Sequence, residues 1–312
     1  MNIKPILQTK LYGLNLIFNE IAYLSNSNKL PNKILFSGSK GCGKSTLAYH
    51  FINYIFSINE NNSYNIKLNE INPNNNSFKL IKNGSHPNFH LIDLIDDKKS
   101  IEISQIRNMI NYTNKSSFNN RPKFILIDNV ENLNINSLNA LLKIIEEPNK
   151  NVFFVLVHND SKKILKTLKS RCLTFKINLT FDQSINITNQ LLNKNIFELL
   201  NKDLINYYMK PGNYISLVNF SKENKIDLNE FNLKKFLLFL IEENYYKKSN
   251  FVKFNIFNFI ELYFLKILNQ STNKNKISSF YTKFIHKIYY ANKFNLDYES
   301  LFMEFKSKIL NG

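Results

Sequence analysis

The stretch Gly38-Ser39-Lys40-Gly41-Cys42-Gly43-Lys44-Ser45 decides the fold of this chain. It has the pattern G-x-x-x-x-G-K-[ST] of the phosphate-binding P-loop, in which glycines let the backbone N–H groups of a turn point at phosphate. The apolar run at residues 33–37 predicts a strand before the turn, and apolar residues at helical spacing from 46 to 52 predict a helix after it. Strand, glycine turn and helix in this order predict an α/β domain with a nucleotide site.

Two residues at the end of this turn carry its chemistry. Lys44 is expected to reach the β- and γ-phosphates, the Ser45 hydroxyl to ligate Mg²⁺, and the helix N-terminus to add its positive dipole end. A glycine turn that opens a helix and binds no ligand is the alternative, and the intact lysine–serine pair argues against it. We therefore expect ATP with Mg²⁺, the nucleotide lying against Gly38, Ser39, Lys40, Gly41, Cys42, Gly43, Lys44, Ser45 and Thr46.

Polar residues follow two later strands. Residues 124–127 are an unbroken apolar run, which is typical of a buried parallel strand, and Asp128 comes directly after it. Because ligands of open α/β sheets bind at the carboxyl ends of the strands, we expect Asp128 to hold Mg²⁺ through water, together with Ser45. A cap of the strand end is the other interpretation of this aspartate. The strand predicted at 152–157 is followed by Asn159, which we expect beside the nucleotide.

The order of elements predicts three domains. Strands alternate with helices up to residue 178, which is typical of a three-layer α/β fold with a parallel sheet. The chain then becomes helical, first in a small segment with a break at 210–213, and then in a stretch rich in Phe, Leu and Ile that predicts a helical bundle. The expected domains are 1–178, 179–225 and 226–312, the last with part of its apolar surface at a subunit interface.

Composition limits the classes of protein that are possible. The 312 residues include 41 basic and 24 acidic ones, a net charge of +17. This excess permits contact with nucleic acid, but A/T-rich codons also produce a chain crowded with Lys, Asn, Ile and Phe, and both explanations remain open. No apolar run approaches the roughly 18 residues of a membrane span, and the first residues lack a secretory signal. The two cysteines, Cys42 and Cys172, favour a cytoplasmic protein without disulfides or a four-cysteine zinc site.

Several short motifs stand in an order that resembles the AAA+ subunits of DNA polymerase clamp loaders. They are the P-loop, LIKNGSHP at 80–87, IEISQIR at 101–107, NALLKIIEEP at 139–148 and SRC at 170–172. The similarity covers residues 30–178 and is only architectural beyond them. It is greatest to the delta-prime branch of the bacterial DNA polymerase III clamp loaders, in the variety that retains a P-loop. The resemblance implies an AAA+ nucleotide-binding domain, a small helical lid and a C-terminal helical collar.

The resemblance also implies partners and a role. Such subunits form a hetero-pentameric ring with gamma/tau-type and delta-type subunits, which opens the sliding clamp and places it on primed DNA for the DNA-directed DNA polymerase. In this family the arginine of the SRC motif projects into the ATP site of the neighbouring subunit, and this role carries over to Arg171. A guanidinium supplied in trans stabilises charge on the transferring phosphoryl group and contributes about 10³–10⁵ in rate. Without the resemblance, Arg171 would be interpreted as a surface arginine.

Departures from the family pattern bear on hydrolysis. The glutamate that normally follows the Walker B aspartate is replaced by Asn129, which cannot accept a proton, and Glu131 is expected to point elsewhere. Loss of a general base costs about 10²–10⁴ in rate. The lid arginine is replaced by Asn213 or Tyr214, and two cysteines exclude the zinc module that is common in the family. These features predict a subunit that binds ATP and hydrolyses it poorly. The alternative is a hydrolysis-competent AAA+ motor subunit of the gamma/tau kind, or another DNA-linked ATPase.

Overall fold

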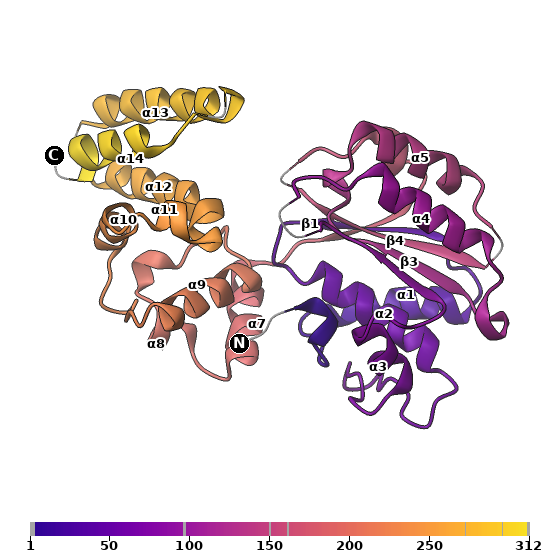
Figure 1. Cartoon of the computed structure of the whole chain (residues 1–312). Coiled ribbons are helices and arrows are strands. Elements are labelled where there is room, and N and C mark those ends of the chain that lie inside the picture. Colours follow the sequence, from indigo (N-terminus) through magenta and orange to yellow (C-terminus); the bar gives the residue numbers. More distant parts are fainter. Residues whose placement is uncertain are drawn as a thin grey trace. The chain divides into compact units, whose positions relative to one another are not determined.

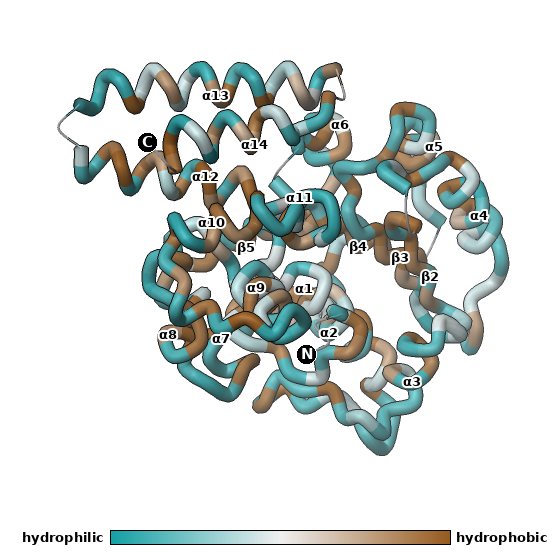
Figure 2. The backbone as a smooth tube through the Cα atoms, turned by 60° about the vertical axis from the view of Figure 1, so that its left-hand side comes forward, coloured by the Kyte–Doolittle hydropathy of each residue, from teal (hydrophilic) through white to brown (hydrophobic). Residues whose placement is uncertain are grey.

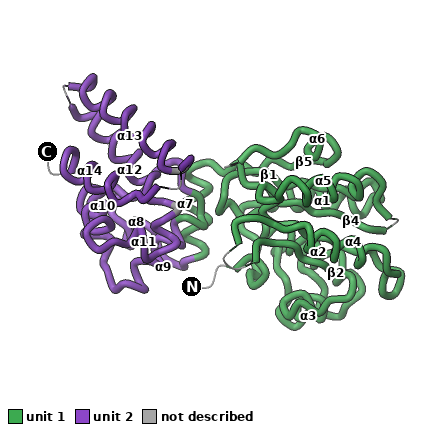
Figure 3. The backbone as a smooth tube through the Cα atoms, turned by 45° about the horizontal axis from the view of Figure 1, so that its top comes forward, with its two compact units in different colours: residues 1–191, 210–213 green, residues 192–209, 214–312 purple. Residues whose placement is uncertain are grey.

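The chain forms two compact units. A computed structural model describes residues 4–95, 98–149, 151–160, 162–271, 273–294 and 296–310, apart from the side chains of 254 and 292. Residues 1–191 with 210–213 make up the first unit, and residues 192–209 with 214–312 make up the second (Figure 3). The three domain ranges expected from the sequence stay predictions beside this division.

The first unit is built on a five-stranded sheet in the order β2-β3-β4-β1-β5. Its neighbouring strands all run parallel, which confirms the expected α/β class. The strands are β1 Lys33–Gly38, β2 Phe89–Ile92, β3 Lys123–Ile127, β4 Val152–Asn159 and β5 Leu173–Ile177. Because the strands are parallel, their carboxyl ends meet at one edge of the sheet, and a ligand of such a sheet binds there.

Helices cover both faces of this sheet. The helices α1 Asn15–Asn26 and α2 Lys44–Ser57 lie on one face, and α4 Ile103–Asn114 and α5 Ile135–Glu146 lie on the other (Figure 1). All five residues of β3 are buried, and alternate side chains enter the two cores: Phe124 packs with α1 and α2, and Ile125 packs with α4 and α5. Burial on both faces explains the unbroken apolar run of this strand, which Figure 2 shows in brown.

Shorter elements complete the first unit. They are the helices α3 Asn76–Lys82, α6 Lys166–Lys169 and α7 Phe181–Leu192 and the 3-10 turns Pro5–Leu7, Phe118–Asn120 and Val130–Asn132. One local expectation is wrong: because serine is a favoured N-cap, the motif at 101–107 predicts Ser104 as the N-cap of the helix that it opens, but α4 begins at Ile103 and Glu102 is its N-cap. The Glu102 and Gln105 side chains form a reciprocal capping box there.

The described residues of the second unit are helical and joined by turns. Their elements are α8 Ile196–Leu199, the 3-10 turn Lys202–Leu204, α9 Pro211–Glu223 from Tyr214 onward, α10 Leu233–Glu242, α11 Tyr245–Lys248, α12 Asn250–Gln270, α13 Lys274–Phe294, α14 Glu299–Phe305 and the π-helical turn Lys306–Leu310. Aromatic rings form much of the core, for example Phe264 against Phe284 and Phe305, with centroids 5.9 and 5.5 Å apart. In the described part of the chain, none of the helices has the length and apolar character that crossing a membrane requires.

Two helix boundaries differ from the expected ones. Within the segment 179–225, the sequence predicts a helix over residues 203–209, but only the 3-10 turn Lys202–Leu204 forms there. The stretch 210–213, predicted as a break, contains the start of α9 at Pro211. A proline fits this place because its fixed φ suits the first turn of a helix, where its missing N–H would have no partner.

Candidate functional site

The P-loop is the turn between β1 and α2. Gly41 and Gly43 have φ angles of 86° and 91°, which only glycine adopts without strain. Lys44, the first residue of α2, is buried, and its Nζ donates to the carbonyl oxygens of Gly38 at 2.9 Å and of Ser39 at 2.7 Å. The Lys44 ammonium group therefore lies against the backbone of the P-loop.

The predicted Mg²⁺ ligands lie in contact. The Ser45 hydroxyl lies close enough to the Asp128 carboxylate to favour its charged form, and this carboxylate accepts from the backbone N–H of Asn129 at 2.8 Å. Burial raises the pKa of Asp128 to about 6; the nearby Asp93 raises it as well, whereas the Ser45 hydroxyl, the Asn129 N–H and Lys44 oppose the shift. A divalent cation would offset the free-energy cost of burying the negative charge of Asp128, and hydroxyl and carboxylate oxygens are ligands that Mg²⁺ prefers. These residues therefore fit Mg²⁺ bound with a nucleotide.

Protein side chains supply only part of such a coordination shell. Within the described residues, no group of three or more His, Cys, Asp or Glu side chains could hold a metal ion. Mg²⁺ commonly keeps several waters and binds one or two carboxylates together with substrate phosphates. The pair of Ser45 and Asp128 therefore suits a metal that arrives with its nucleotide.

A network of amide and carboxylate side chains links the carboxyl ends of β2, β3 and β4. Asn129 has a left-handed φ of 55°, and its Nδ2 donates to Asp93 Oδ1 at 2.7 Å. The Asn159 Nδ2 group donates to Asn129 Oδ1 at 2.9 Å and to Glu131 Oε1 at 2.7 Å. The backbone N–H of Asn159 also donates to Glu131 Oε2 at 3.1 Å. Glu131, expected to point elsewhere, thus lies at this edge, where it holds Asn159.

The first turn of α9 contacts the P-loop. The backbone N–H of Gly212 donates to the carbonyl oxygen of Gly41 at 2.9 Å. The Asn213 Oδ1 atom accepts from the Lys210 backbone N–H at 3.1 Å, and Lys210 Nζ donates to the carbonyl oxygen of Leu179 at 2.9 Å. Asn213, at a place considered for the family's lid arginine, therefore caps a turn and brings no positive charge.

Arg171 lies away from these residues. It precedes β5, whose first residue Leu173 pairs with Ile34 near the start of β1, so Arg171 lies at the amino ends of the strands. Its guanidinium donates to Glu146 Oε1 at 2.6 Å and to the carbonyl oxygen of Thr167 at 2.8 Å, and 34% of its side chain remains exposed. Glu146 belongs to the NALLKIIEEP stretch, so this ion pair joins it to the SRC motif.

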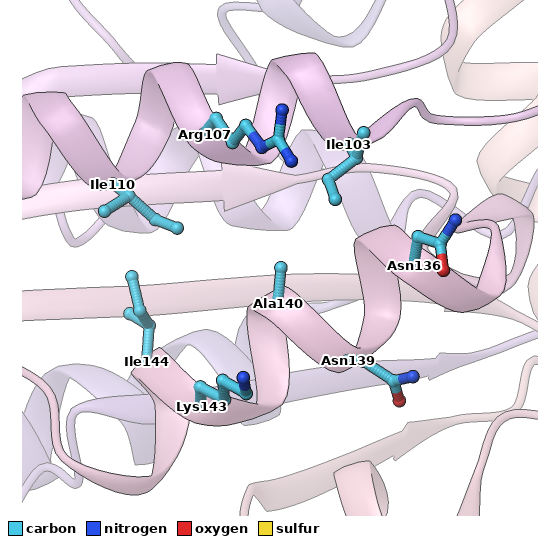
Figure 4. Close-up of a pocket in the computed structure, with 8 residues that line it drawn as sticks. All are labelled: Ile103, Arg107, Ile110, Asn136, Asn139, Ala140, Lys143 and Ile144. Atoms are coloured by element: carbon cyan, nitrogen blue, oxygen red, sulfur yellow. The ribbon is translucent and has the colours of Figure 1, made fainter.

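A groove of about 580 Å³ lies between α4 and α5 (Figure 4). Arg107 from α4 and Lys143 from α5 supply its charges, and Figure 4 shows both side chains on the helices that border it. The other lining residues are Ile103, Ile110, Asn136, Asn139, Ala140 and Ile144. Two of the sequence motifs therefore meet in one groove whose charged residues are both positive.

The sequence predictions missed four residues of these sites: Asp93, Glu131, Glu146 and Gly212. Asp93 had a usable signal, because it follows a strand directly, as Asp128 does. No comparable pattern marked Glu146 or Gly212, whose partners are far away along the chain.

Comparisons with known proteins agree with the motifs. The family described as "DNA polymerase III, delta subunit" matches residues 14–180, which is more than half of the chain. DNA polymerase III subunit delta' of Buchnera aphidicola subsp. Baizongia pistaciae is 29% identical over 280 residues, 88% of this chain and 73% of that protein. The delta' subunit of Bacillus subtilis is 30% identical over 161 residues, 52% of this chain and 45% of that protein. DNA polymerase III subunit gamma of Buchnera aphidicola subsp. Schizaphis graminum is 33% identical over 187 residues, 59% of this chain and 49% of that protein.

The chain thus spans about half the length of the last two relatives. Among solved structures, a DNA polymerase III gamma subunit-related protein of Thermotoga maritima is similar with a TM-score of 0.47 and 15% identity, over 91% of this chain and 96% of that one. The family match includes the P-loop, Asp128, Asn159 and Arg171. The chain therefore belongs to the DNA polymerase III delta subunit family, as a delta-prime-like clamp-loader protein with an AAA+ fold.

Proposed function

We propose that this clamp-loader subunit binds ATP with Mg²⁺ weakly or structurally, hydrolyses it slowly, and supplies Arg171 in trans to a neighbouring ATPase subunit. One observation carries the proposal: an intact P-loop with Ser45 in contact with Asp128 stands beside an amide, Asn129, at the place of the usual general base. Binding groups are present, and the residue that would activate water at that place is absent.

Each group at the nucleotide site has a role in binding. The Lys44 ammonium and the backbone N–H groups of the turn would contact phosphate, and Ser45 and Asp128 would hold Mg²⁺. The metal, when bound, offsets the negative charge of the phosphates. Both protons of the Asn159 Nδ2 group are donated, to Asn129 and to Glu131, so only the Asn159 Oδ1 atom would remain to accept from a group at the nucleotide. This arrangement favours retention of the nucleotide over turnover.

The location of Arg171 supports a role toward another subunit. It lies at the opposite end of the strands from the P-loop, and its guanidinium remains partly exposed beside Glu146. A guanidinium that reaches a neighbour's nucleotide stabilises charge as the phosphoryl group transfers. We propose gamma/tau-type and delta-type subunits as its neighbours in a hetero-pentameric ring, which acts on the sliding clamp and, as an assembled complex, on primed DNA.

Reconstitution with the other clamp-loader subunits and the sliding clamp tests this function. The Arg171→Ala variant is expected to lower ATP hydrolysis at the neighbouring subunit's site by about 10³-fold or more, which reduces the clamp-dependent ATPase rate of the complex by that site's share, and to leave ATP binding by this chain unchanged. Lys169→Ala is the matched control, because it removes a nearby exposed positive charge. Equal rates for the wild-type and Arg171→Ala complexes would remove the finger role, and failure to form a ring at micromolar concentration would contradict the assignment. Turnover of several ATP per second by the isolated chain would favour a motor subunit instead.

A further inference from the structure

Asn129, the amide in the place of the general base, donates a hydrogen bond to the carboxylate of Asp93. In the parallel pairing of β2 with β3, Ile92 is the partner of Ile127. The next residues on the two strands are Asp93 and Asp128, so the two acids lie side by side at the edge that carries the P-loop. The Asn129 Nδ2 group donates to Asp93 Oδ1 at 2.7 Å and connects the two strand ends.

Asp93 is held in one orientation. Its Oδ1 atom accepts both from Asn129 Nδ2 and from the backbone N–H of Leu94, each at 2.7 Å. Its backbone carbonyl accepts from Gln105 Nε2 at 2.8 Å, and Gln105 belongs to the capping box of α4. Among the described residues, the other carboxylate oxygen, Oδ2, accepts no hydrogen bond. The side chain is thus fixed through one oxygen and leaves the other available, which is the arrangement that a general base requires.

We propose that Asp93 takes over the role of the missing general base: Asp93 is the carboxylate that accepts the proton of the attacking water, and Asn129 is the amide that positions the Asp93 side chain. In this step the water oxygen forms a bond to the γ-phosphorus. The bond from the γ-phosphorus to the bridging oxygen breaks, and its electron pair leaves with ADP. The proton passes to Asp93 and from there to solvent. This inference rests on the proposed ATP site and concerns the slow hydrolysis at that site.

The pairing of Asp93 with Asn129 can be tested without nucleotide. Thermal unfolding of the nucleotide-free chain is compared for Asp93→Ala, Asn129→Ala and the double variant. If the two side chains act as a unit, the double variant loses no more in Tm than the more damaging single variant. Additive losses in Tm would show independent side chains and would overturn the proposal.

Single-turnover hydrolysis with excess protein over labelled ATP tests the chemical role. Asp93→Asn is expected to lower the rate by about 10²–10⁴-fold. The exchange variant Asp93→Asn/Asn129→Asp keeps one acid and one amide and is expected to recover at least a tenth of the wild-type rate. Asp160→Asn is the matched control, because it removes an acid that directly follows β4 and lies outside this network, and its rate should equal that of the wild type.

In the hydrolysis experiment, three results would also overturn the proposal: a wild-type rate no higher than that of Lys44→Ala, an unchanged rate in Asp93→Asn, or an exchange variant that binds ATP without recovering hydrolysis. A binding assay with a fluorescent ATP analogue distinguishes failure of the role proposed for Asp93 from failure of the proposed ATP site. If the wild-type chain binds the analogue no better than Lys44→Ala, the ATP site itself is refuted. If all Asp93 variants bind it like the wild type while Asp93→Asn hydrolyses ATP normally, only the role of Asp93 is refuted.

Discussion

Replacement of Gly212 by alanine is expected to destabilise the first unit, although alanine normally stabilises a helix. Gly212 is the second residue of α9, where alanine would gain up to about 1 kcal/mol from helix propensity alone. A Cβ atom at this position would, however, lie 2.8 Å from the Gly41 Cα atom and 3.2 Å from its carbonyl oxygen. Backbone atoms cannot rotate away as a side chain can, so the first turn of α9 would have to move off the P-loop.

The size of the effect follows from these contacts. Overpacking costs about 1–3 kcal/mol, and the stretched hydrogen bond from Gly212 to Gly41 costs about 1 kcal/mol more. After the gain in helix propensity, the net loss of unfolding free energy is about 1–3 kcal/mol. At about 2–4 °C per kcal/mol for a unit of this size, Tm should fall by about 2–12 °C.

Thermal unfolding of the nucleotide-free chain measures this loss, and binding of a fluorescent ATP analogue reports on the P-loop. Gly84→Ala is the matched control: the φ of Gly84 is 67° and a Cβ there would meet no atom within 4 Å, so alanine introduces strain without a clash. We expect Gly84→Ala to lower Tm alone and Gly212→Ala to lower both Tm and ATP affinity. A Tm of Gly212→Ala equal to or above that of the wild type would refute the reasoning, because propensity would then outweigh the clash.

Three further predictions follow from the contacts and charges described above. Glu146→Gln should change the unfolding free energy by less than about 1 kcal/mol in chemical denaturation, because its ion pair with Arg171 is partly exposed; a larger loss would mean a more important pair. If Arg107 and Lys143 contact phosphates of primed DNA in the assembled complex, Arg107→Ala/Lys143→Ala should reduce the salt slope for DNA binding by about 2, and an unchanged slope would place the DNA elsewhere. Burial lowers the pKa of His50 from 6.5 to about 4, so the unfolded state binds more protons between these values. Stability should therefore fall by up to about 3 kcal/mol as pH drops from 6.5 to 4, and Tm of a His50→Gln variant should vary less with pH over that range.

The fold of the first unit could be predicted because its signals are local and strong. Buried strands such as β3 read as continuous apolar runs, and the glycines of the P-loop have few other uses between a strand and a helix. Asp128 follows β3 directly, so the parallel arrangement alone brings it to the edge where α2, the helix of Ser45, begins. These expectations needed no knowledge of long-range contacts.

The conformation of Asn129, the position of Glu131 and some helix ends could not be predicted, because they depend on contacts between residues that no sequence pattern indicates. The left-handed backbone of Asn129 turns the chain so that Glu131 returns to the sheet edge, and many asparagines have no such conformation. The sequence predicts a helix over residues 203–209, where the structure has only the 3-10 turn Lys202–Leu204, because apolar spacing alone does not give the length of a helix. Ser104 and Glu102 could both serve as the N-cap of α4. Glu102 does so, because its backbone N–H donates to Gln105 Oε1 in the capping box.

The position of the Lys44 ammonium has a consequence for affinity. Its two hydrogen bonds to the carbonyl oxygens of Gly38 and Ser39 already satisfy most of its donors before any phosphate arrives. Contact with a phosphate oxygen would then replace an internal bond with an external one, so only the difference between the two strengths adds to binding. The number of contacts in a nucleotide complex would therefore overstate the affinity of the P-loop for its ligand. On release of ADP, the Lys44 ammonium would re-form its hydrogen bonds to the P-loop backbone, which would favour that release.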